Sequence, residues 1–89
     1  MIYLVSYDVR ATRRRNRVAK HLETHGRRIQ LSVCLLDDPT IRPRALLAEL
    51  GDLIDPKTDR IDLFPLCRRC LGSTEGVGRP LPPTSDGAV

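Results

Sequence analysis

The chain has 89 residues, a formal net charge of +4 at pH 7 and 29 % charged residues. A chain of this length forms at most one domain and buries only about 60 to 65 % of the surface that its unfolded form exposes. No apolar run approaches the ~18 residues that a membrane-spanning helix needs, which excludes such a span.

The first quarter of the chain predicts a strand followed by a helix. Residues 2–7 are nearly all β-branched, aliphatic or aromatic, as in a central strand, and this strand ends at Asp8. Thr12 can serve as the N-cap of a helix that runs to His25. Gly26 can then close the last helical turn in the left-handed conformation.

The middle of the chain predicts a strand, a helix and a last strand. Residues 28–35 alternate apolar and polar side chains, with Cys34 on the polar side of this half-buried strand. Thr40 can cap the second helix, and residues 61–66 form the last strand. A ferredoxin-like βαββαβ sheet needs two strands between its helices. Either the run bends at residues 31–33 into two short strands, or the third strand is vestigial; the sequence leaves both open.

The end of the chain differs in composition from the rest. Residues 72–89 are rich in Gly and Pro, so we predict a folded domain over residues 1–71 and a separate segment over 72–89. We expect residues 72–81 to be able to add an edge strand to a partner's sheet, and residues 82–89 to be disordered. A core this small is often completed across a subunit interface, which predicts a homodimer.

The positive charge is concentrated in one part of the chain. Thirteen of the fifteen basic residues are Arg, and eight bases lie between Arg10 and Arg28 against one acid, Glu23. Arg binds phosphate through two parallel hydrogen bonds, so we interpret this region as a nucleic-acid contact; a solvated basic face is the alternative. Helical spacing gathers part of it into one stripe, formed by Arg13, Asn16, Arg17, Lys20 and Thr24.

Asp8 is the candidate catalytic residue because a central strand delivers it to the surface. Magnesium in phosphodiester chemistry is usually held by one or two carboxylates together with substrate phosphate and water. One Asp in each chain is too few, but a two-fold axis nearby would pair two copies of Asp8. The alternative is an ordinary Asp in the turn that ends the strand.

The cysteines and histidines give weaker signals. Cys67 and Cys70 form half of a zinc site, and we interpret them as free thiols because the chain has no second pair. A four-sulfur site shared by two chains and an oxidised bridge are the alternatives. His21 and His25 lack the Glu that a zinc-protease helix requires, so we assign them no metal. Met1 leads directly into a strand, without the basic start of a signal peptide, and we expect a cytoplasmic protein.

Several fragments, in this order and spacing, together resemble the small CRISPR-associated adaptation protein, a family also described as CRISPR-associated endoribonucleases or endonucleases. The resemblance covers residues 1 to about 72. The fragments are Tyr7-Asp8, Arg15-Asn16-Arg17-Val18-Ala19, Arg28-Ile29-Gln30-Leu31-Ser32-Val33, Leu53-Ile54-Asp55 and Phe64-Pro65-Leu66-Cys67.

The resemblance implies an α+β, ferredoxin-like homodimer that joins two dimers of the larger adaptation integrase and holds DNA during spacer insertion. It also implies Mg²⁺-dependent cleavage of DNA or RNA, with Asp8 as metal ligand and catalytic residue. With the basic region added, the predicted nucleic-acid-binding residues are Arg13, Arg14, Arg15, Arg17, Lys20, Arg28 and Ser32.

Two other functions fit the same residues. One is a non-catalytic scaffold that grips duplex DNA and bridges integrase dimers, which needs only charge and shape. The other is a small ferredoxin-like RNA-binding toxin or regulator, which would prefer RNA and would not bind the integrase. Substitution of Asp8 separates the nuclease from the scaffold, since only cleavage depends on it.

Overall fold

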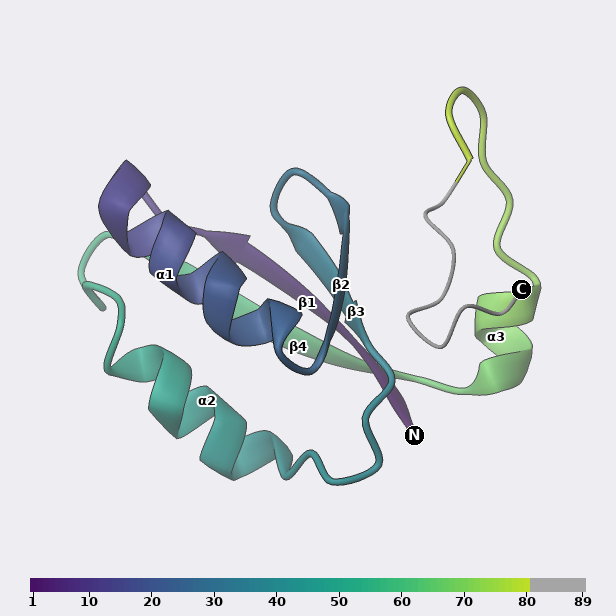
Figure 1. Ribbon diagram of the computed structural model, residues 1–89, viewed down its shortest axis with the longest axis horizontal. Helices are drawn as coiled ribbons and strands as arrows, with labels where there is room; N and C mark the ends of the chain where they lie inside the picture. The colour runs from purple at the N-terminus through teal and green to yellow at the C-terminus, as the bar shows by residue number, and fades with distance from the viewer. Residues whose placement is uncertain (81–89) are drawn as a thin grey trace.

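The computed structural model describes residues 1–80 and contains four strands and three helices (Figure 1). The strands form one antiparallel sheet in the order β2-β3-β1-β4. The βαββαβ order confirms the predicted α+β class, with a short third helix added at the end. In chain order the elements are β1 (Ile2–Asp8), α1 (Thr12–Glu23), β2 (Gly26–Gln30), β3 (Val33–Leu36), α2 (Pro43–Gly51), β4 (Arg60–Leu66) and α3 (Arg68–Gly72).

The region between α1 and α2 forms two short strands, so the first of the two alternatives left by the sequence is correct. The chain turns at Leu31 and Ser32, and the Leu31 side chain is 84 % exposed. The predicted role of Gly26 as a left-handed helix cap is wrong, since Gly26 is the first residue of β2. A Cβ at this position would collide with the carbonyl oxygen of Leu35 in β3, so the glycine permits close strand pairing.

Both predicted helix caps are also wrong. Ala11 is the N-cap of α1 and Thr12 is its first helical residue, with no capping hydrogen bond from a side chain. The N-cap of α2 is Arg42, with Pro43 in the first turn, where a missing backbone N–H is tolerated. Thr40 instead belongs to a turn before the helix, where its backbone N–H donates to Asp38 Oδ1 at 2.9 Å.

The helices α1 and α2 pack on one face of the sheet, and the hydrophobic core lies between them and the strands (Figure 1). Cys34 lies within this core and is fully buried, so its predicted place on a polar face is wrong. Burial of each large apolar side chain stabilises a fold by about 1.5–3 kcal/mol. The buried core residues are Val5, Tyr7, Val9, Val18, Ala19, Leu22, Cys34, Leu36, Leu46 and Leu50.

The opposite face of the sheet is covered by neither α1 nor α2. Because directly paired residues share a face, Leu4 lies there with Leu35 and Phe64, its partners on β3 and β4. Phe64 is 48 % exposed, whereas Leu35 is 1 % exposed. We call this the uncovered face. Residues 74–80 pass along it and line, with its apolar side chains, a groove of about 750 Å³.

The C-terminal segment begins with α3, beyond the end of β4 and away from the other two helices (Figure 1). The predicted domain boundary between residues 71 and 72 falls inside this helix. Residues 73–80 form no strand within this chain, so addition of a strand to a partner's sheet stays a prediction. The expectation for residues 82–89 falls outside the described residues. Between residues 1 and 80 no helix is long and apolar enough to cross a membrane.

Candidate functional site

Asp8 ends β1 with an exposed side chain at one edge of the uncovered face. In the register of the sheet it pairs with Arg60 of β4, and Ser6 pairs with Asp62 one step earlier on the same face. Arg60 Nε donates to Asp62 Oδ2 at 2.8 Å, so the cation beside Asp8 is engaged by another carboxylate. Asp8 itself makes no side-chain hydrogen bond to any residue in the described range, which leaves its oxygens available to a ligand from solution.

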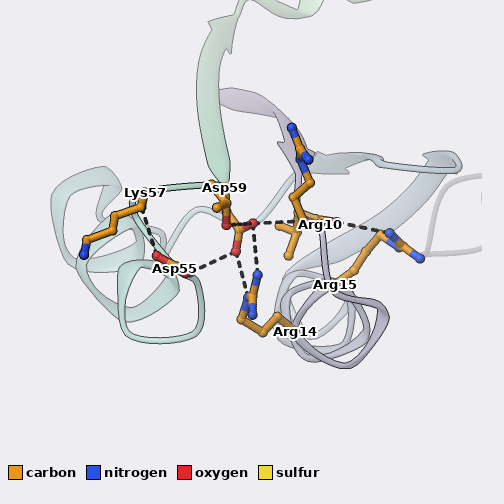
Figure 2. A network of polar contacts seen from close by, with 8 residues as sticks. Arg10, Arg14, Arg15, Asp55, Lys57 and Asp59 are labelled. Atoms are coloured by element: carbon orange, nitrogen blue, oxygen red, sulfur yellow. Dashed lines mark hydrogen bonds and ion pairs between the residues drawn. The ribbon is translucent and has the colours of Figure 1, made fainter.

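The loop that follows Asp8 is fixed from two sides (Figure 2). Asp59, just before β4, accepts the backbone N–H of Arg10 on Oδ1 at 3.0 Å. Arg15 Nη1, from the first turn of α1, donates to the carbonyl oxygen of Val9 at 3.1 Å. These two contacts hold the two residues that come directly after Asp8, and therefore set the position of the Asp8 backbone.

Asp59 is the centre of this polar network. Its side chain is fully buried, and Arg14 Nε donates to Oδ2 at 2.8 Å while Arg14 Nη2 donates to Oδ1 at 3.3 Å. The backbone N–H of Asp55 and the hydroxyl of Thr58 donate to the same carboxylate. The hydrogen bond from Arg14 is the main reason that the pKa of Asp59 lies well below its usual range, against the opposing effect of burial. Asp59 is therefore a carboxylate at neutral pH.

The exposed side of α1 carries the predicted basic stripe. The side chains of Arg13, Arg17 and Lys20 are exposed, and none makes a hydrogen bond or ion pair with another residue between 1 and 80. Val18 and Leu22 face the core on the opposite side of the same helix. Three cations are thus held on a rigid element and remain free to bind phosphate.

The other predicted binding residues have contacts within the chain. Arg14 is paired with Asp59, and Arg15 bonds to Val9 and to Thr12 Oγ1. Arg28 Nε lies 3.6 Å from Glu23 Oε2, a long and exposed ion pair that phosphate can displace. Ser32 lies in the β2–β3 turn, where its carbonyl oxygen accepts the Tyr7 N–H at 3.0 Å. Arg14 and Arg15 thus organise the loop after Asp8, which distinguishes them from the three free cations.

His21 on α1 and His25 in the turn after α1 each contact a neighbouring element. His21 Nε2 lies 2.9 Å from Glu49 Oε1 on α2, and His25 Nδ1 lies 2.9 Å from Asp38 Oδ2 after β3. The hydrogen bond with His25 is the main cause that lowers the pKa of Asp38 to about 2, and Thr40 contributes through its hydroxyl and its N–H. Within residues 1–80 no three His, Cys, Asp or Glu side chains are close enough to hold a metal ion together.

Comparison with known proteins identifies the family. The family model described as CRISPR associated protein Cas2 matches residues 1–74. The chain belongs to the Cas2 family. A Rhodospirillum rubrum protein named CRISPR-associated endoribonuclease Cas2 4 is 41 % identical over 78 residues, covering 85 % of this chain and 61 % of that protein. A Chloroflexus aurantiacus protein named CRISPR-associated endoribonuclease Cas2 1 is 40 % identical over 86 residues, covering 93 % of this chain and 90 % of that protein.

A solved structure agrees with this assignment. The crystal structure of Streptococcus pyogenes Cas2 superimposes with a TM-score of 0.78 at 30 % identity, covering 88 % of this chain and all of that chain. The resemblance inferred from the sequence fragments is therefore confirmed. The chain spans about three fifths of the Rhodospirillum protein, 61 % of its length, and nearly all of the Chloroflexus protein.

The sequence did not reveal the role of Asp59. It lies at the end of a run, Asp55 to Asp59, that has the composition of an ordinary turn. Its partners Arg10 and Arg14 are 49 and 45 positions away along the chain. Local spacing carries no signal of a contact over that separation, so only the folded structure identifies this residue.

Proposed function

We propose that this Cas2 family member is a cytoplasmic, Mg²⁺-dependent endonuclease that cleaves DNA or RNA and takes part in spacer acquisition. The observation that supports this most is the combination of a free, exposed Asp8 carboxylate with a loop fixed by Asp59 and Arg15. The names of the relatives support the same reaction class, since they describe endoribonucleases and an endonuclease.

The donor at this site has the chemistry that magnesium prefers. Asp8 offers carboxylate oxygens at the surface, and Mg²⁺ is typically bound by one or two carboxylates, with phosphate and water as the other ligands. Such an ion, when bound, generates a nucleophilic hydroxide from water and neutralises charge on the phosphate. Asp8 and its copy in a second chain would hold it.

A homodimer through the uncovered face supplies that second copy. Leu4, Phe64 and Leu66 lie on the same face as Asp8, toward the opposite end of β1 and β4. Contact between two copies across this face would bury apolar area, and a two-fold axis near Asp8 would pair the two carboxylates. Residues 74–80 line a groove on this face and are exposed, so they are accessible to a partner chain. The dimer and the metal site therefore depend on the same surface.

The chain's own residues have separate tasks in this proposal. Arg13, Arg17 and Lys20 bind the phosphate backbone and carry no sequence information, since they project from a helix without a platform of aromatic side chains for the bases. Asp59 and Arg15 keep the Asp8 backbone in place while substrate binds. Duplex DNA fits such contacts better than an unpaired strand does.

The second candidate function is a scaffold that bridges dimers of the larger adaptation integrase and grips duplex DNA without cutting it. The free cations of α1 favour it, because binding requires only these charges. Asp8 would then have no chemical task.

One experiment separates the two functions. Labelled duplex DNA and single-stranded RNA are incubated with wild type, with Asp8→Asn and with Asp52→Asn, each with Mg²⁺ or with a chelator. Asp52 is a matched control because it is an exposed Asp at the end of α2. The nuclease requires that cleavage be lost in Asp8→Asn and in chelator but kept in Asp52→Asn. Cleavage that survives Asp8→Asn, or no cleavage by wild type with intact DNA binding, supports the scaffold.

A further inference from the structure

Two cysteines that the proposed reaction does not use lie in contact at the start of α3. Cys67 is the N-cap of this helix and Cys70 is in its first turn, and the two sulfur atoms are 3.0 Å apart. The backbone N–H of Cys70 donates to Cys67 Sγ at 3.2 Å. Both residues are exposed. The separation of the two sulfur atoms therefore exceeds the length of a disulfide bond by only about 1 Å.

The two sulfurs are chemically unequal. The side-chain hydrogen bond between the two thiols is the main cause that lowers the pKa of Cys67, and the Cys70 N–H contributes. The same interaction raises the pKa of Cys70. Since the thiolate is the nucleophile in disulfide exchange, Cys67 is the attacking group and Cys70 the resolving group.

The third cysteine provides an internal comparison. Cys34 is fully buried in the core, and burial is the main cause that raises its pKa to about 11. A thiol that is both protonated and inaccessible does not exchange with solutes. Reactivity is thus confined to the pair on α3.

We propose that Cys67 and Cys70 are a reversible redox site, which forms an intramolecular disulfide by exchange with a small-molecule disulfide such as glutathione disulfide. The Cys67 thiolate attacks one sulfur of the small disulfide, which forms a mixed disulfide and releases one thiol. The Cys70 sulfur then attacks Cys67 and releases the second thiol. The two cysteines are oxidised, the small disulfide is reduced, and the protons of both cysteines end on the released thiols. This chemistry is independent of nucleic-acid cleavage.

The site lies where the chain leaves the sheet. Arg68 Nη2, between the two cysteines, pairs with Asp37 Oδ1 at 3.0 Å beyond the end of β3. Leu71, one residue after Cys70, lines the groove over the uncovered face together with residues 74–80. A disulfide would therefore fix the turn that connects β4 to the segment along this face.

The test uses the full chain with mixtures of oxidised and reduced glutathione, followed by acid quenching, alkylation under denaturing conditions and mass measurement. We expect the number of free thiols to fall from the three of the reduced chain to one, located at Cys34, and to be restored by dithiothreitol. Three thiols that persist at every glutathione ratio would overturn the proposal. So would stable glutathione adducts or covalent dimers in place of the internal bond.

Single substitutions test the assigned roles. Cys70→Ser should trap glutathione on Cys67, whereas Cys67→Ser should react several-fold more slowly through Cys70. Cys34→Ala is the matched control and should still form the disulfide. Equal reaction rates of the two single variants would contradict the assignment of Cys67 as nucleophile. Protection of both thiols by stoichiometric zinc, without a disulfide in zinc-free protein, would reassign the pair to metal binding.

Discussion

Arg14 Nε donates a hydrogen bond to Asp59 Oδ2 at 2.8 Å, which joins the first turn of α1 to the residue that precedes β4. The carboxylate also receives the backbone N–H groups of Arg10 and Asp55 (Figure 2). A single buried side chain therefore connects the loop after Asp8, the first helix and the last strand.

Asp59→Ala should lower the Tm by more than about 5 °C, because it leaves the N–H groups of Arg10 and Asp55 without acceptors. Arg14→Gln should lower the Tm by less, since Asp59 still accepts hydrogen bonds from backbone N–H groups. The control is Asp62→Ala, which breaks only the exposed pair with Arg60 and should change Tm by about 2 °C or less. Thermal unfolding followed by circular dichroism measures all three. Equal effects of Asp59→Ala and Asp62→Ala would show that the network adds no stability.

Stability should fall as the pH drops from about 4 toward about 2. The pKa of Asp38 is lowered to about 2, and that of Asp59 lies well below its usual range. A depressed carboxyl pKa means that the unfolded chain binds protons first, so the contribution is complete above about pH 4 and is lost as pH falls through the folded-state pKa. Urea unfolding at several pH values measures this slope. Asp38→Asn should flatten it, and an unchanged slope in that variant would contradict the role of the contact with His25.

The strands of the sheet could be predicted from composition, whereas the hairpin between the helices could not. Residues 2–7 and 61–66 are dense in strand-forming side chains, and the structure confirms both as β1 and β4. The turn at Leu31 and Ser32 lacks the Gly, Pro, Asn or Asp that usually marks a turn. The alternation of apolar and polar residues continues across it, so the sequence does not show where the first strand ends. Gly26 is visible in the sequence, but the reason that glycine is needed there is not. A side chain at this position would collide with the carbonyl oxygen of Leu35, and that pairing is defined only by the fold.

The candidate site also contains some features that the sequence could predict and others that it could not. Asp8 and the exposed cations were predictable, because a strand end and helical spacing are both local features. The engagement of Arg14 by Asp59 was not, because helical spacing leaves Arg14 out of the exposed stripe but does not identify its partner. Asp59 is 45 positions away along the chain, so the ion pair is defined only by the fold.

Gly26→Ala should destabilise the protein by about 2 kcal/mol or more, because the added methyl group would meet the backbone of β3 rather than a side chain that can move. Gly51→Ala is the matched control. Gly51 is the last residue of α2, and a Cβ there meets nothing within 4 Å, so its replacement should be neutral or slightly stabilising. Urea unfolding of both variants gives the comparison. A neutral Gly26→Ala would mean that β2 and β3 separate at little cost.

The free cations of α1 should determine the salt dependence of nucleic-acid binding. Log K should fall by about 0.7 to 0.9 per neutralised phosphate for each unit of log salt, the smaller value for single strands. Changing Arg13, Arg17 and Lys20 to Gln together should reduce that slope by the contribution of up to three neutralised phosphates. Each side chain is exposed and makes no hydrogen bond or ion pair within residues 1–80.

The matched control replaces Arg42, Arg44 and Lys57, which are exposed on other elements and carry the same total charge. Titration of labelled duplex DNA at several salt concentrations gives the slope for wild type and both triple variants. If net charge alone drew the DNA to the protein, the two variants would lose the same slope. A loss confined to the α1 variant would instead assign the phosphate contacts to that helix, because only the position of the charges differs between the two proteins.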